Sequence, residues 1–109
     1  RKAVHAVVDI AIQQGDIAIL FPHSQAASIL KDDKGYRVGR NRASDAEHRN
    51  SEQVVVDTVR RFKGLESAVI LLVVDGDVAK NAELLYVGMT RAQAVLEVFG
   101  PEHVLRALN

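Results

Sequence analysis

The sequence has 109 residues, 48% of them hydrophobic and 26% charged, which fits one globular domain with a core of its own. Its 14 basic and 14 acidic residues leave no net charge, so overall charge gives no argument for a nucleic-acid partner. The longest apolar run, residues 68–74, is too short for a membrane span, and cysteine, with its disulfide and thiolate chemistry, is absent. We therefore expect a soluble, cytoplasmic protein without a signal peptide, and the start at Arg1 suggests a fragment.

The first third of the chain alternates helical and strand patterns. Apolar residues at helical spacing predict a helix over residues 2–13. The run "DIAILF" at residues 16–21, ended by Pro22, predicts a buried strand. Ser24 is then placed to cap a helix over residues 25–31.

The middle and last parts of the chain hold the strongest strand patterns. After a short strand "YRV" at residues 36–38, the polar residues 39–52 predict a mobile loop. Nearly continuous apolar runs predict strands buried on both faces at residues 54–59 and 68–74. The remaining predicted elements are a helix over residues 82–92, a strand at 95–99 and a helix over 101–108.

Helices that alternate with doubly buried strands indicate an α/β domain around a mostly parallel sheet. Ligands of such sheets bind at the carboxyl ends of the strands. The turn at residues 60–66 follows the strand at 54–59, so we expect its charged side chains to project at that edge, with Gly64 allowing close backbone approach. Taken alone, the string Lys63-Gly64-Leu65-Glu66 would also fit a plain tight turn with a solvated Glu66.

Charge is distributed unevenly along the chain. Residues 34–63 contain eight Lys or Arg against four acids, whereas residues 64–109 contain three against six. The basic part fits contacts with phosphates, and it equally fits a solvated loop that carries arginines.

Three stretches resemble, in order, conserved motifs of one enzyme family. "GDIAILFPHSQAA" at residues 15–27, "DTVRRFKGLESAVILL" at 57–72 and "LLYVGMTRAQAVLEVFG" at 84–100 are similar to motifs IV, V and VI of superfamily 1 helicases of the UvrD-like group. The resemblance implies that residues 1–109 form the second RecA-like motor domain of an ATP-dependent DNA helicase or translocase. It also implies a three-layer RecA-like fold, with a mostly parallel sheet of about five strands flanked by helices.

The resemblance also implies roles at the nucleotide. Arg91 would be the arginine finger that meets the γ-phosphate, and Glu66 would accept a hydrogen bond from the ribose. Lys63 and Gly64 would shape the turn near the phosphates. Without the family, Arg91 would equally fit a charge that complements a helix end or pairs with a surface acid.

For nucleic acid, the resemblance implies backbone contacts to a single strand, with DNA the expected form. Thr58 and Arg60, in the first half of motif V, are the candidates. The arginine that usually follows the strand of motif IV is replaced by Pro22, with His23 beside it. His23 either donates to a phosphate in its place or is a solvated loop histidine. The large subdomain usually inserted between motifs IV and V is missing, which leaves open whether the parent protein unwinds duplexes or only translocates.

The chain has no Gly-x-x-x-x-Gly-Lys-Ser/Thr string, so a first RecA-like domain would have to bind most of the ATP and Mg²⁺. We expect no metal ligands here and no ATP turnover by the isolated chain. Two other classes remain possible: a flavodoxin-like or receiver-like ligand-binding module, and a degenerate motor domain used for protein interaction. The former predicts an acidic cluster after the first strand, where Pro22 and His23 stand instead.

Overall fold

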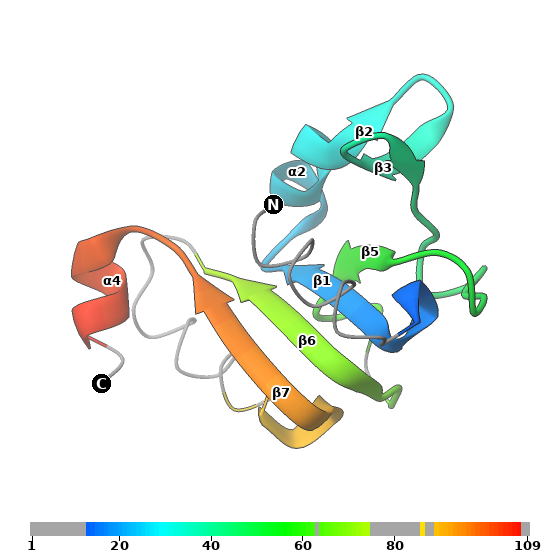
Figure 1. Cartoon of the computed structure of the whole chain (residues 1–109). Helices are drawn as coiled ribbons and strands as arrows, with labels where there is room; N and C mark the ends of the chain where they lie inside the picture. Colours follow the sequence, from blue (N-terminus) through cyan, green and yellow to red (C-terminus); the bar gives the residue numbers. More distant parts are fainter. Residues whose placement is uncertain (1–12, 63, 75–85, 87–88, 108–109) are drawn as a thin grey trace.

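The computed structural model describes residues 13–62, 64–74, 86 and 89–107, which form short helices and strands (Figure 1). The helical elements are η1 (Gln14–Asp16), α2 (Ser24–Ala27), η2 (Ser28–Leu30) and α4 (Glu102–Ala107). The strands are β1 (Ile17–Phe21), β2 (Lys31–Asp32), β3 (Gly35–Val38), β4 (Asn41–Arg42), β5 (Val55–Thr58), β6 (Ser67–Val73) and β7 (Ala92–Phe99). Among the described residues, no helix is long and apolar enough to cross a membrane.

Four of the strands form a parallel sheet in the order β5-β1-β6-β7. The strands predicted at residues 16–21, 54–59 and 68–74 are confirmed as β1, β5 and β6. Strand β7 begins at Ala92, three residues before the predicted start of the last strand. A separate antiparallel sheet, β2-β3-β4, lies beyond α2 in Figure 1. The protein is therefore an α/β domain, as the pattern predicts, compatible with a RecA-like fragment.

Alternating side chains of the central strands supply two hydrophobic clusters, one on each face of the parallel sheet. In β1, Ile17, Ile19 and Phe21 belong to one cluster, and Ala18 and Leu20 belong to the other. All five are buried, which is why the run is apolar at every position rather than at every second one.

Each face is covered by different parts of the chain. The first cluster packs against α2, η2 and β3 through Ala27, Leu30 and Val38. The second packs against α4 through Val104 and against the β5–β6 connection through Phe62. The sheet is thus the middle of three layers, and the connection that carries the Lys-Gly-Leu-Glu string belongs to one outer layer.

Several predicted boundaries differ from the structure. The residue that caps α2 is His23 rather than Ser24, because the backbone N–H of Ala26 donates to His23 Nδ1 at 3.1 Å. The helix predicted over residues 2–13 lies outside the described residues except at Gln13, and most of the helix predicted over 82–92 lies outside them too. In the described part of the second helix, residues 89–91 are helical.

The polar segment at residues 39–52, for which a mobile loop is predicted, makes specific hydrogen bonds to the rest of the fold. It contains β4. In addition, the Ser44 carbonyl accepts the Val56 N–H of β5 at 2.8 Å, and the Ser44 N–H donates to the Val54 carbonyl at 3.0 Å. Further along, the Gly15 N–H donates to the Ser51 carbonyl at 3.1 Å. A Cβ on Gly15 would lie 2.4 Å from the Asn50 carbonyl oxygen, so only glycine permits this approach.

Candidate functional site

The connection between β5 and β6 runs from one edge of the sheet to the opposite edge. Strand β5 ends at Thr58 and β6 starts at Ser67, and both run in the direction of β1, which lies between them. Residues 59–66 must therefore return from the carboxyl edge to the amino edge, about 20 Å away at about 3.3 Å per residue. The expectation that the whole turn projects at the carboxyl edge is wrong, because Glu66 lies at the amino edge.

Glu66 and Arg91 come together at this amino edge. The register pairs Ser67 of β6 with Ala92 of β7, and Glu66 and Arg91 are the residues directly before this pair. The side-chain amide of Gln93 donates to Glu66 Oε2 at 2.9 Å, which links the starts of the two strands. A carboxylate and a guanidinium from segments far apart in the sequence thus share one edge of the sheet.

Arg91 is half-buried, and its Nε is a buried nitrogen without a hydrogen-bond partner. Within the described part of the chain, no acid forms an ion pair with this side chain. Leaving a buried donor unsatisfied costs free energy, about 1–3 kcal/mol, and a charged donor costs more. Among the described residues, the structure therefore shows no surface ion pair for Arg91, and its role at the nucleotide stays a prediction.

Gly64 lies midway along the connection with a φ of +84°, a left-handed conformation that favours glycine. Its backbone is exposed, and the Leu65 N–H next to it donates to the Phe62 carbonyl at 3.0 Å. Lys63 lies outside the described residues. The hydrogen bond from Leu65 to Phe62 closes a tight turn whose conformation depends on Gly64.

His23, Thr58 and Arg60 gather at the opposite, carboxyl edge. Phe21 pairs with Thr58 in the register, and His23 and Arg60 each follow two residues later. Thr58 is only 7% exposed, and its Oγ1 accepts the Arg61 N–H at 3.2 Å, so its hydroxyl oxygen supports the turn. Because His23 Nδ1 accepts a hydrogen bond, the proton of the neutral ring lies on Nε2.

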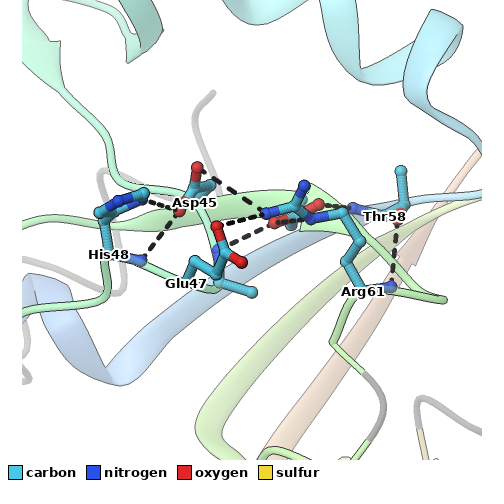
Figure 2. Close-up of polar contacts among 7 residues, drawn as sticks. Asp45, Glu47, His48, Thr58 and Arg61 are labelled. Carbon is cyan, nitrogen blue, oxygen red and sulfur yellow. Dashed lines mark hydrogen bonds and ion pairs between the residues drawn. The ribbon is translucent and has the colours of Figure 1, made fainter.

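Arg60 and its neighbour Arg61 have opposite environments. Arg60 is exposed and has no ion pair with any described residue. Arg61 faces a group of acids shown in Figure 2: its Nε lies 3.2 Å from Asp57 Oδ2, and its Nη2 lies 3.6 Å from Glu47 and 3.9 Å from Asp45. Arg60 is thus available to an external anion, whereas Arg61 is occupied by its own chain.

One of these acids, Asp45, also contacts His48: His48 Nδ1 lies 2.8 Å from Asp45 Oδ1 (Figure 2). The hydrogen bond to Asp45 raises the pKa of His48 above its usual value of 6.5. Burial pushes the pKa of Asp45 upward, but hydrogen bonds from the His48 ring and backbone outweigh it, so this pKa is lowered below 3.8. The pair is therefore a small pH-sensitive contact within the polar segment.

Most arginines of the basic stretch at residues 37–49 are held by the chain itself. Arg42 makes a bidentate contact with Asp32, and Arg37 lies 3.5 Å from the same carboxylate. Arg49 donates to the Glu66 carbonyl at 2.6 Å, to the Gly15 carbonyl at 3.3 Å and to the hydroxyl of Ser67. These three side chains therefore have partners within the chain, while those of Arg37 and Arg42 remain 49% and 37% exposed.

Two residues that the sequence reasoning missed, Arg49 and Gln93, hold Glu66. Each is separated from Glu66 by many residues, and neither forms a recognisable spacing with it. Their contacts with Glu66 become visible only in the folded structure, where the start of β6 lies beside β7 and beside the polar segment. The described residues contain no group of three side chains that could hold a metal ion.

Comparison with known families adds one finding to this geometry. Residues 53–98 match the family model described as "UvrD-like helicase C-terminal domain". The matched range contains Thr58, Arg60, Gly64, Glu66 and Arg91, whereas His23 and Arg49 lie outside it. No curated protein matches the chain significantly.

Proposed function

Because residues 53–98 match the model of the UvrD-like helicase C-terminal domain family, we propose that this chain is the second motor domain of an ATP-dependent superfamily 1 helicase. A first motor domain, which carries the P-loop missing from these 109 residues, would close against it. The whole chain would form this one domain, inactive in isolation and cytoplasmic, in keeping with its lack of cysteine.

The observation that carries this proposal is the meeting of Glu66 and Arg91 at the amino edge of the sheet. A nucleotide cleft between two domains needs a cation for the phosphates and an acceptor for the sugar. Arg91 brings a permanent positive charge with an unsatisfied donor, and Glu66 brings a carboxylate. The two residues therefore supply the chemistry of one wall of such a cleft.

Each side chain has a defined task in this proposal. The Arg91 guanidinium stabilises the negative charge that develops on the γ-phosphate, and the Glu66 carboxylate accepts a hydrogen bond from a ribose hydroxyl. The left-handed turn at Gly64 keeps backbone close to the phosphates, and Lys63 adds charge there. Mg²⁺, held mainly by the first domain, neutralises phosphate charge when bound.

The carboxyl edge is the proposed nucleic-acid side. Arg60 is exposed and unpaired within the described residues, so it can bind a backbone phosphate without first breaking an ion pair. His23, whose Nδ1 caps α2, lies at the same edge, and Thr58 would contribute its hydroxyl proton. The partner is a single strand, with DNA the expected form.

The decisive experiment uses the full-length protein with both motor domains and measures nucleic-acid-stimulated ATP hydrolysis. Arg91→Ala should lower kcat by about 10³ to 10⁵, the usual effect of an arginine finger, and Arg91→Lys should recover little of it. Arg106→Ala, which removes an exposed arginine from α4, is the matched control. Near-normal turnover by a folded Arg91→Ala protein would overturn the assignment of Arg91 as the arginine finger and remove the main support for the motor-domain proposal.

A second measurement tests the nucleic-acid edge. Arg60→Ala should weaken single-strand binding for all base sequences and flatten the log–log salt dependence by about 0.7, as expected for one lost phosphate contact. Arg106→Ala should leave the slope unchanged. A slope unaffected by Arg60→Ala would place the strand elsewhere.

A further inference from the structure

Arg49 connects the polar segment to the turn that carries Glu66. Its guanidinium donates to the Glu66 carbonyl at 2.6 Å, to the Gly15 carbonyl at 3.3 Å and to the Ser67 hydroxyl. Its central carbon lies 5.5 Å from the centre of the Phe62 ring, within range of a cation–π contact. A planar group with this many fixed partners has little freedom, so the backbone it binds is fixed with it.

Gln93 holds the same residue from the other side. Its amide donates to Glu66 Oε2 at 2.9 Å, from a position in β7 two residues after Arg91. The other carboxylate oxygen, Oε1, has no hydrogen-bond partner among the described residues. The backbone of Glu66 is thus fixed by Arg49, one oxygen is engaged by Gln93, and the remaining oxygen is open to a ligand.

We infer that Arg49 and Gln93 are positioning residues that hold the Glu66 carboxylate ready for a nucleotide sugar and so set the preference for ribose. This inference rests on the proposed nucleotide role of Glu66. A hydrogen bond to a charged acceptor discriminates strongly against a ligand without the hydroxyl, but only if the acceptor is held in place. Without both hydrogen-bonding partners the Glu66 side chain would be mobile, and it would lose conformational entropy on binding either sugar, which weakens the discrimination between them.

The test compares ATP with 2′-deoxy-ATP and 3′-deoxy-ATP in the nucleic-acid-stimulated ATPase of the full-length protein. The wild type should prefer ATP over one deoxy analogue by about tenfold or more in kcat/KM, the usual range for a hydrogen bond to a charged group. Glu66→Ala should abolish this preference. Gln93→Ala should reduce it several-fold and raise KM for ATP while kcat changes little, because the support is made before the chemical step.

Arg49 needs variants that separate positioning from folding. Arg49→Ala should remove most of the sugar preference, and Arg49→Lys should restore part of it, since an ammonium can still donate to the Glu66 carbonyl. Arg42→Ala is the matched control, because Arg42 is also held by its own chain, at Asp32 in the hairpin. Gln25→Ala, at an exposed position of α2, controls for the loss of an amide. Both controls should keep the wild-type preference.

The outcomes separate this inference from the proposed function. If Glu66→Ala loses the sugar preference while Gln93→Ala and Arg49→Lys both keep it in full, the positioning role is overturned and the motor domain stands. If Glu66→Ala itself keeps the preference, the sugar role of Glu66 fails and the inference falls with it. If Arg49→Ala does not fold, Gln93→Ala and Arg49→Lys decide the result.

Discussion

Two neighbouring arginines show how strongly local partners determine what a cation can do. Asp57 is buried, at 2% exposure, and its carboxylate accepts from the Ala46 N–H at 2.8 Å and from the Thr58 N–H at 2.7 Å. Arg61 supplies the neutralising charge at 3.2 Å. A buried carboxylate needs this combination of donors and charge, so Arg61 belongs to the fold, and Arg60 remains available to a ligand.

Replacing each arginine by alanine should therefore have different effects on stability. Arg61→Ala leaves Asp57 without its cation and should lower the free energy of unfolding by about 1–3 kcal/mol. Arg60→Ala removes the same charge from an unpaired position and should change it by less than about 0.5 kcal/mol. Urea unfolding of the two variants measures both values. Equal losses would contradict the structural assignment of Arg61.

The contact between His48 and Asp45 should make stability depend on pH. The pKa of His48 is raised in the folded state, so its contribution is complete below the unfolded value of about 6.5 and is lost as pH rises through the folded value. The lowered pKa of Asp45 means that the carboxylate contributes above about 3.8 and loses its effect as pH falls through the folded value. The pair is fully stabilising between these two limits.

His48→Gln, which keeps the backbone hydrogen bond to Asp45, should thus be less stable than the wild type near pH 5.5 and equally stable near pH 9. Unfolding curves at both values measure the difference. Titration of His48 by NMR gives a second check, because Asp45→Asn should lower its pKa. A gap between the variants that grows with pH would have the wrong sign.

At the scale of elements, the connection at residues 59–66 has the largest consequences. It links strands that both pair with β1, and its one large buried side chain is Phe62, at 1% exposure. Phe62 packs with Val104 of α4 against the second face of the sheet. The packing of Phe62 therefore helps to position Arg60, Arg61 and Glu66, the described charged residues of the connection.

Phe62→Ala should lower the free energy of unfolding by about 3–5 kcal/mol, the usual cost of removing a buried aromatic ring. Phe62→Leu keeps most of the apolar contact and should cost about 1.5 kcal/mol or less. Denaturant unfolding of both variants provides the measurement. If the alanine variant lost no more than the leucine variant, Phe62 would not be the anchor of the connection.

The sequence predicts best the elements whose own residue composition reports how deeply they are buried. Strands β1, β5 and β6 are apolar at nearly every position because both faces are covered, and this is visible without any partner. The contacts of the polar segment at residues 39–52 could not be predicted, for the opposite reason. Its structure comes from contacts with distant residues, such as Gly15 with Ser51 and Arg49 with Glu66, and local composition carries no sign of them.

At the scale of the whole molecule, the sheet order decides which candidate residues can act together. Motif resemblance found Glu66 and Arg91 as well as Thr58 and Arg60, but only the strand directions place the first two at one edge and the last two at the other. Among the described residues the mostly parallel sheet, predicted with about five strands, has four, and a separate antiparallel sheet of three short strands is also present. Pairing between distant segments cannot be read from local periodicity, so these features needed the structure.

The central place of β1 in the parallel sheet has a consequence for hydrogen exchange. Its residues pair with partners far along the chain, Ala18 with Val55 on one side and Ile19 with Leu71 on the other, so no local hairpin can protect them. Backbone amides of β1 should therefore exchange with deuterium only when the whole domain unfolds, with a protection free energy equal to that from urea unfolding. Amides of β7, whose Val95 is 39% exposed and which pairs with β6 alone in the described sheet, should exchange sooner through local opening. Faster exchange in β1 than in β7 would mean that the domain opens from its centre.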